Sequence, residues 1–402
     1  MNATSFSYSP AWVGGRLVAA VLFTGLQLSL VLFPFGSVRA GENEERNAFT
    51  WKNLQSDIAG VADRTDPNLV NSWGLTINTT ANIFWIADNV SGVSTLYRPD
   101  GSPVLLPSTP PQNFVTIPPT SADTGSPPTA APTGIVFNPS SINPSSKVFL
   151  FSKPAMPAVF LWDGEDGAIF AWNPGVDLTN AKIVVDKSSP DPTISSVYKG
   201  LALANRQSGG PTLYAANFHN GVVDVFDSNF KPVTGGFVDP NLPANYAPFG
   251  IASIDNLLYV TFALQNGAKH DDVSGVGHGF VDVFTPEGVL IKRLIPFTPG
   301  SGHLNSPWGL AMVPHEFGKF GHDVLLVGNF GDGTINAFDI NTGNFIAPLE
   351  NRRGESLDFN GLWALFFFDD QLYFTAGIGD ETHGLFGVIR PVEREEEEDS
   401  HE

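Results

Sequence analysis

Short runs of alternating hydrophobic and polar residues recur along the chain from about residue 49 onward. The runs "VVDVF" (222–226) and "VDVF" (281–284) alternate with the period of two that is typical of a β-strand. Asn-Gly at 220–221 and Asp-Gly at 332–333 precede such runs, and both dipeptides favour tight hairpins. After the first 40 residues, no long stretch repeats hydrophobic residues at helical spacing. The pattern predicts an all-β protein.

One phrase occurs twice, as "NFHNGVVDVFD" (217–227) and as "NFGDGTINAFD" (329–339). Each copy belongs to a longer unit that begins with Gly followed by an apolar strand and ends in a strand closing on Phe-Asp. Six such units can be read from the glycines at Gly74, Gly134, Gly200, Gly250, Gly309 and Gly361. Repeats of about 40–50 residues with several strands each indicate a β-propeller, and longer intervals indicate inserted loops. The sequence therefore predicts one six-bladed propeller over residues 49–391.

Three segments stand outside these units. The strand-like run 49–60 has no partner nearby, so we expect it to complete the last blade and close the ring. Residues 106–132 are rich in Pro, Ser and Thr and are expected to form an extended excursion between the first two blades. Residues 147–154 form an additional strand-like run that the repeat does not place.

The N-terminal segment predicts export. Arg16 precedes the 17 uncharged residues 17–33, and small residues at Val38 and Ala40 follow a Pro-Gly break. This order is typical of a secretory signal peptide, so we expect cleavage after Ala40, a short linker over 41–48 and a secreted or periplasmic protein. The alternative is an anchor formed by an uncleaved 17–33 segment. After cleavage no stable membrane span is expected, and the mass of the mature N-terminus checks the cleavage.

Charge and cysteine content exclude several classes of function. The formal net charge is −20, and residues 392–402 form an acidic tail that we expect to be disordered. A negative surface repels phosphate backbones, so nucleic acid is not an expected partner. The chain has no cysteine, which excludes thiolate metal sites and cysteine nucleophiles. An exported protein without disulfides needs a large core or a closed ring, and we expect a monomer.

The repeat resembles the NHL-type propellers. Longer strings, among them "GVADRTDPNLVNSWGL" and "LNSPWGLAMVP", resemble more narrowly an uncharacterised family of secreted propellers, known mostly as conserved hypothetical proteins of bacteria. The similar strings span about residues 49–390. The resemblance implies the propeller fold and export, and it implies no reaction. Some members of that family end in a C-terminal sorting tail, which this chain replaces with its acidic run.

In a propeller, the loops that enter the innermost strands and the loops between the second and third strands open on one face, around the mouth of the axial tunnel. Those loops carry imidazoles and carboxylates that suit a divalent metal: His270, Asp271, Asp272, His278, Asp380 and Glu381. Such a metal could activate water for hydrolysis. The alternative is that these residues form solvent-facing turns, because none has a standard ligand spacing.

A second hypothesis is ligand binding by stacking on aromatic side chains. Trp73, Phe249 and Trp308 occupy equivalent positions at the entries to inner strands. The alternative is that they pack between blades as core. Asn217 and Asn329 repeat at equivalent turns, and repetition favours an architectural role.

The histidines unique to one blade, His219 and His383, are better candidates for binding. We therefore expect His219, His383 and Asp380 to form the polar centre of the mouth, with Trp73 and Trp308 as its wall. The opposite face is expected to carry short turns with little specific chemistry.

The leading functional hypothesis is an exported, non-catalytic module that binds a small molecule, a glycan or a protein at the tunnel mouth. The alternative is a metal-dependent, lactonase-like hydrolase at the same face. Six-bladed lactonases place acidic and amide ligands at the starts of inner strands, where this chain has Trp73, Thr133, Lys199, Phe249 and Trp308. No motif for the cofactor of quinone-dependent sugar dehydrogenases is present. The cofactor is unknown, with a divalent metal as the one candidate.

Overall fold

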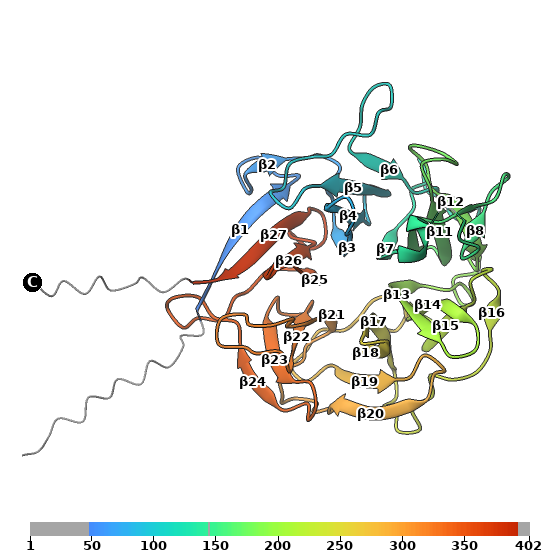
Figure 1. Cartoon of the computed structure of the whole chain (residues 1–402). Helices are drawn as coiled ribbons and strands as arrows, with labels where there is room; N and C mark the ends of the chain where they lie inside the picture. The colour runs from blue at the N-terminus through green and yellow to red at the C-terminus, as the bar shows by residue number, and fades with distance from the viewer. Residues whose placement is uncertain (1–47, 144, 393–402) are drawn as a thin grey trace, which may run out of the picture. The chain divides into compact units, whose positions relative to one another are not determined.

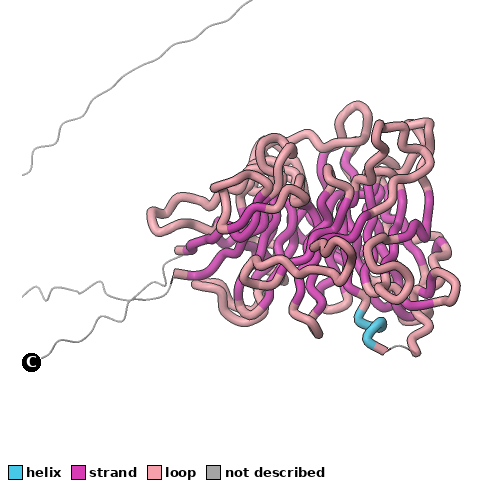
Figure 2. The backbone as a smooth tube through the Cα atoms, turned by 90° about the horizontal axis from the view of Figure 1, so that it is seen from above, coloured by secondary structure: helices cyan, strands magenta, loops and turns pink. Residues whose placement is uncertain are grey.

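The computed structural model describes residues 48–143 and 145–392. Strands and loops account for this part of the chain apart from one short 3-10 helix, η1 (Pro139–Ile142), which Figure 2 shows in cyan. No helix in these residues is long and apolar enough to cross a membrane. The expected signal peptide, the linker up to residue 47 and residues 393–402 of the acidic tail lie outside the described residues.

Six sheets form the six blades of a propeller (Figure 1), and their strands pair antiparallel except for the parallel pair β1–β2. From the innermost strand outward they are blade 1, with β3 (Ser72–Asn78), β4 (Ile83–Asp88), β5 (Val93–Tyr97) and β6 (Phe114–Thr116); blade 2, with β7 (Pro132–Phe137), β10 (Phe160–Gly164), β11 (Ala168–Trp172) and β12 (Lys182–Asp186); blade 3, with β13 (Tyr198–Arg206), β14 (Gly210–Asn217), β15 (Val222–Phe226) and β16 (Pro232–Val233); blade 4, with β17 (Tyr246–Ile254), β18 (Leu257–Leu264), β19 (Phe280–Phe284) and β20 (Leu290–Ile295); blade 5, with β21 (Pro307–Met312), β22 (Val324–Asn329), β23 (Ile335–Asp339) and β24 (Phe345–Pro348); and blade 6, with β25 (Leu362–Phe368), β26 (Gln371–Ala376), β27 (Leu385–Pro391), β1 (Phe49–Ser56) and β2 (Arg64–Thr65).

The N-terminal strand closes the ring, which confirms the prediction. β1 pairs antiparallel with β27 from Phe49 opposite Pro391 to Ser56 opposite Leu385. The innermost strands contact one another in sequence, and β25 contacts β3 to complete the circle. Because the ring is closed, both faces of each sheet pack against neighbouring sheets. The chain therefore forms a large buried core without disulfides.

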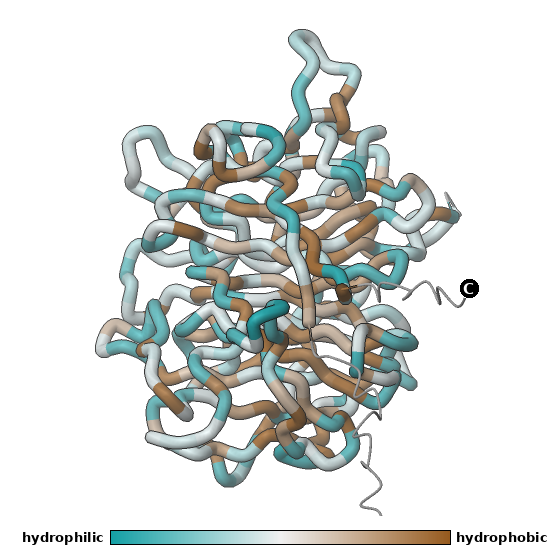
Figure 3. Tube along the Cα trace, turned by 90° about the vertical axis from the view of Figure 1, so that its left-hand side faces the viewer, coloured by the Kyte–Doolittle hydropathy of each residue, from teal (hydrophilic) through white to brown (hydrophobic). Residues whose placement is uncertain are grey.

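Hydrophobic clusters fill the interfaces between successive blades. One cluster joins blades 1 and 2 through stacked Trp85 and Phe160, whose ring centroids lie 4.2 Å apart. Another joins blades 6 and 1 through Phe84 and Tyr373, at 4.5 Å. Figure 3 shows the hydropathy along the trace, with hydrophobic stretches in brown crossing the interior and many of the peripheral segments in teal or white. Each sheet lies between two others, so the side chains on both of its faces are buried.

The glycines that mark the repeat lie where inner strands approach one another. A Cβ atom on Gly74, Gly134, Gly250 or Gly309 would overlap backbone atoms of the next blade's inner strand. Each inner strand also has an irregular register at its start. Glycine is therefore required at these four positions because the backbones of neighbouring inner strands approach closely. Such close approach is a known reason for a glycine inside a strand.

The structure contradicts one of the six predicted anchors. In blade 6 the register pairs Leu362 with Ala376, so the counterpart of Gly74 is Ala364 and not Gly361. Gly361 instead precedes the strand with φ +68°, and Asn71 takes a similar left-handed conformation in blade 1 (φ 49°). The Gly-Leu-Trp string of blade 6 imitated the Gly-Leu start of the other units while lying three residues early.

The irregular start of an inner strand leaves backbone N–H groups that the second strand of the same blade satisfies with side chains. The Asp163 carboxylate accepts from the Gly134 N–H (2.7 Å) and from the Thr133 hydroxyl (3.0 Å). Thr261 accepts from the Gly250 N–H at 2.8 Å in blade 4. Burial raises the pKa of the fully buried Asp163 to about 7, despite these two hydrogen bonds.

This pKa predicts a pH-dependent stability that Asp163→Asn should remove. Between pH 4 and 7 the folded protein keeps a proton on Asp163 that the unfolded chain has released, so ionisation destabilises the fold as the pH rises. Relative to the wild type, Asp163→Asn should gain up to about 4 kcal/mol of unfolding free energy between pH 4 and pH 8. Urea denaturation at pH 4.5, 6 and 8 measures the difference. A difference that does not change with pH would show that Asp163 keeps an ordinary pKa.

The two other segments outside the repeat also find places. Residues 147–154 contain β8 (Leu150–Phe151), which pairs with β9 (Met156–Pro157) in a small separate sheet. There the buried Phe149 donates its N–H to the Ser228 carbonyl of blade 3. The Pro-rich stretch 106–132 carries β6, so it supplies the outermost strand of blade 1.

Candidate functional site

Aromatic rings fill the centre of the propeller below the tunnel mouth. At the equivalent position of the six inner strands stand Trp73, Thr133, Lys199, Phe249, Trp308 and Trp363. Trp73 stacks on Trp363 with centroids 3.5 Å apart, and Trp308 meets both edge-on. Trp73, Phe249 and Trp308 are 1%, 0% and 9% exposed, so all three lie in the core of the structure.

Lys199 is the one charged residue of this ring, and its side chain is only 3% exposed. The Trp308 indole N–H donates to the Lys199 carbonyl at 2.7 Å and fixes its backbone. The Lys199 Nζ lies 5.2 Å from the centre of the Trp73 ring, within the range of a cation–π contact. The ammonium therefore lies against the mouth side of these aromatic rings. We call the rings of Trp73, Phe249, Trp308 and Trp363 the aromatic plug.

Glu165 is the main partner of Lys199. It lies in the tight turn between β10 and β11, where Gly167 (φ +80°) donates its N–H to the Gly164 carbonyl. Its carboxylate forms an ion pair with the Lys199 ammonium. Burial alone would raise the pKa of Glu165 and lower that of Lys199, but the opposite charges override burial, so the pKa of Glu165 is lowered and that of Lys199 is raised.

A chain of hydrogen bonds extends from this pair across the mouth to blade 6. Asn89 donates to Glu165 at 2.8 Å, and Asn71 donates to Asn89 at 3.3 Å and to Glu381 at 3.0 Å. Asn71 also accepts from the Trp363 indole N–H at 3.2 Å, which ties the chain to the aromatic plug. Asn71 and Glu381 are 310 residues apart in sequence.

The loop between β18 and β19 brings two further groups to the same place. The His270 Nδ1 lies 2.7 Å from an Asp271 carboxylate oxygen, and that oxygen is 3.6 Å from the Lys199 ammonium. Asn266 stabilises the conformation of this loop. Its side chain accepts a hydrogen bond from the His270 backbone N–H and donates one to the Asp271 carboxylate. The hydrogen bond between the pair raises the pKa of His270 and lowers that of Asp271 to about 2.

Seven residues from five blades thus form one polar group, which we call the mouth network: Asn71, Asn89, Glu165, Lys199, His270, Asp271 and Glu381. Asp272 lies beside it, with the Ser306 hydroxyl next to its carboxyl. Burial raises the pKa of both Asp272 and Glu381. Four carboxyl groups thus lie around one lysine and one histidine in the mouth.

Of the expected metal residues, the structure brings His270 and Asp271 together with Glu165, which the sequence analysis does not predict. The ligand atoms of these three residues all lie within 4.8 Å of one another. Glu381 and Asp272 are close enough to act on Lys199 or on each other electrostatically. In contrast, His278 bonds through Nδ1 to the Val273 carbonyl of its own loop at 2.8 Å, and Asp380 is exposed.

The repeated asparagines bond mainly to the segments that lead into the inner strands of their own blades. Asn217 is buried and donates to Ser196 and Asp224 at 3.0 and 2.9 Å. Asn329 is fully buried, donates to the His303 carbonyl at 2.9 Å and accepts from the Asn305 N–H at 3.1 Å. Both side chains hold the loops that enter the inner strands, which is an architectural role.

The two histidines proposed as the polar centre have other partners. His219 is 8% exposed, and its Nε2 contacts the Thr193 carbonyl at 3.2 Å. His383 bonds through Nδ1 to Asp57 at 2.6 Å, and Asp57 also accepts from the Gly384 N–H. His383, in the loop between β26 and β27, thus bonds to the residue that follows β1. Glu381, two residues earlier, takes the place in the mouth that we expected for His383.

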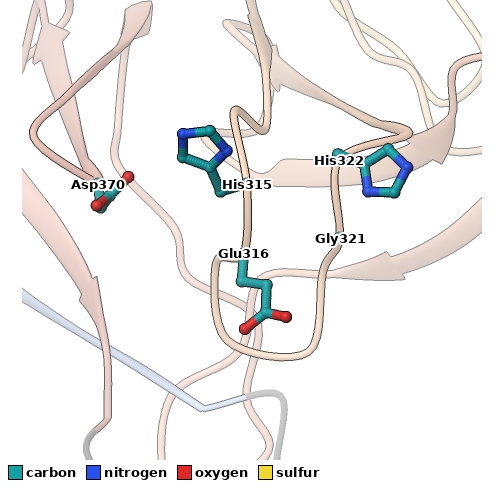
Figure 4. Close-up of a pocket in the computed structure, with 5 residues that line it drawn as sticks. All are labelled: His315, Glu316, Gly321, His322 and Asp370. Carbon is teal, nitrogen blue, oxygen red and sulfur yellow. The ribbon is translucent and has the colours of Figure 1, made fainter.

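The structure also contains a shallow hollow of about 510 Å³ on the opposite face, between the β21–β22 loop and the β25–β26 turn. His315, Glu316, Gly321, His322 and Asp370 line it. Figure 4 shows that the four polar side chains point in different directions and not toward a common centre. His322 pairs with its neighbour Asp323 at 3.2 Å, and its side chain is 78% exposed. This hollow offers no convergent set of ligands.

No family model matches the chain. It is 32% identical over 367 residues to uncharacterised protein R648 of Acanthamoeba polyphaga mimivirus, covering 89% of this chain and 82% of that protein. It is also 32% identical over 369 residues to uncharacterised protein L690 of the same virus, covering 89% of this chain and 88% of that protein. The chain belongs to the family of these mimivirus proteins. The bacterial, secreted and NHL-type features of the expected family remain predictions.

Solved structures with the same fold include a glucose dehydrogenase, with a TM-score of 0.51 and 15% identity over 86% of this chain and 100% of that chain. A protein of unknown function from Bacteroides thetaiotaomicron gives a TM-score of 0.52 at 11% identity, covering 85% of this chain and 76% of that chain. At these identities the likeness shows the propeller fold alone.

Proposed function

We propose that the protein is an exported, non-catalytic propeller that binds a small, positively charged ligand at the tunnel mouth. The observation that carries this proposal is the mouth network, in which loops of five blades converge on a buried Lys199–Glu165 ion pair. Four carboxylates lie in or beside this network, those of Glu165, Asp271, Asp272 and Glu381. If all four are ionised, Lys199 alone reduces their formal charge to −3, and a protonated His270, whose pKa is raised, reduces it to −2.

A cationic ligand is favoured over a neutral one because it would compensate this charge. Asp271 is the carboxylate most open to solvent, with its side chain 60% exposed, and it lies beside the His270 ring. The aromatic plug beneath the network is buried, so it supports the charged groups and offers little stacking surface. A ligand therefore binds mainly by charge-assisted hydrogen bonds to carboxylates.

The test is calorimetric titration of the full chain with organic cations of different shapes: arginine, spermidine, glucosamine and choline. At least one should bind with 1:1 stoichiometry and more weakly at higher salt. Asp271→Asn should weaken that binding at least tenfold. The control is Asp323→Asn, which removes an exposed carboxylate that also pairs with a histidine, on the opposite face. Equal weakening by the two variants, or no binding at all, would refute the proposal.

A metal-dependent hydrolase is the second candidate function. The observation in its favour is that Glu165, His270 and Asp271 place one ligand atom each within 4.8 Å of one another. Three protein ligands with one position open to substrate is the arrangement that catalytic zinc sites use. Hydrolysis of lactone or ester substrates that requires added metal, and that His270→Ala abolishes, would favour this candidate.

A further inference from the structure

We propose that the mouth binds a divalent transition-metal ion between Glu165, His270 and Asp271. This inference rests on the proposed function, because it names the cation that the mouth takes. The three side chains come from two blades and from loops about 100 residues apart in sequence, and the fold brings one ligand atom of each within 4.8 Å of the others.

The donor set selects the class of metal. One imidazole nitrogen and two carboxylates suit zinc or manganese, whereas calcium and magnesium prefer oxygen ligands alone. The neighbours of these donors also match the outer shell of a metal site. Asn89 donates to the Glu165 carboxylate at 2.8 Å and Asn266 donates to the Asp271 carboxylate at 3.2 Å, which orients both donors.

Asp272, which follows Asp271 directly, adds a further carboxylate beside the three donors. Its carboxyl lies within hydrogen-bonding reach of the buried Ser306 hydroxyl and acts electrostatically on Lys199 and Glu381. A divalent cation bound between the three donors would offset part of this concentration of carboxylates.

Lys199 decides how strongly the metal binds. Its ammonium contacts Glu165 and lies 3.6 Å from the Asp271 carboxylate, so it already neutralises part of the charge that attracts a metal. Each carboxylate oxygen has two lone pairs, so Glu165 can keep its bond to Lys199 while it binds a metal. The ammonium repels the metal, and we therefore expect binding in the micromolar range and not the tighter binding of a structural zinc site.

The test is calorimetric titration of Zn²⁺, and then of Mn²⁺ and Ca²⁺, into the full chain without a purification tag and after treatment with chelator. Zinc should bind 1:1, and calcium at least tenfold more weakly. His270→Ala should weaken zinc binding at least tenfold. The matched control is His322→Ala, since His322 also lies beside an aspartate (Asp323, 3.2 Å) but has no third ligand.

The outcomes separate this inference from the proposed function. Absence of zinc binding, or zinc binding that His270→Ala and His322→Ala weaken equally, would overturn the metal site. If an organic cation still bound in the mouth, the proposed function would stand without the metal. Thermal denaturation of both variants checks that they fold, and Asp271→Asn provides a second variant of an exposed ligand for the same titration.

Discussion

Replacing Lys199 by Met should lower the free energy of unfolding by about 3–5 kcal/mol, because it leaves the buried carboxylate of Glu165 without its cation. The methyl group of the new side chain can still pack on the Trp73 ring, so the loss reports on charge more than on packing. Urea denaturation at pH 7, followed by tryptophan fluorescence, measures it.

Two companion variants make this result specific. The double variant Lys199→Met with Glu165→Gln should recover most of the loss, since it removes both charges. Lys182→Met is the matched control, because the Lys182–Asp177 pair has a similar contact of 2.7 Å but its side chains are 47% and 27% exposed. We expect that control to lose less than about 1 kcal/mol. If Lys199→Met lost no more than Lys182→Met, the mouth would not contain a strongly coupled ion pair.

Gly250→Ala should destabilise the protein by about 3 kcal/mol or prevent folding, because the new Cβ would overlap the backbone carbonyl of Trp308. Neither backbone can move without shifting an inner strand of the ring. The same change at Gly200 serves as the control, since its Cβ would come no closer than 3.2 Å to the Phe249 carbonyl. Gly200→Ala should therefore cost much less, as the natural Ala364 of blade 6 illustrates.

Chemical denaturation of both glycine variants measures the two losses. Equal losses would mean that the glycines act through the flexibility of the unfolded chain and not through close contact between blades. A large loss confined to Gly250 would establish that the spacing of inner strands sets the packing of the ring.

The sequence was sufficient to predict the architecture because its signals are local. Gly-Leu starts, Asn-Gly turns and alternating strands identify the blades, and the unpaired run 49–60 predicts the closing strand. The register of blade 6 was assigned wrongly because Gly361 imitates the repeat. The true counterpart of Trp73, which is Trp363, became apparent only from strand pairing.

The mouth network was harder to predict because its contacts join distant residues. Glu165 lies within "DGEDG", where an acidic residue between glycines looks like an ordinary turn former. Its partner Lys199 was noted only as a departure from the lactonase pattern. His270, Asp271 and Glu381 are metal candidates by residue type, but nothing in their spacing indicates that Glu165 completes the group. Besides these candidates, the sequence signal for this site is Lys199, a charged residue at a position that is aromatic in four of the six blades.

The most direct test of the account is a crystal structure of the protein soaked with the organic cation or metal that binds most tightly in solution. We predict density for that ligand at the tunnel mouth, within hydrogen-bonding or coordination distance of Asp271 and at least one of Glu165, His270 and Glu381. Density only in the hollow near His315 and Asp370, or on the outer strands, with the side chains of the mouth network unchanged, would contradict the assignment of the mouth as the functional site.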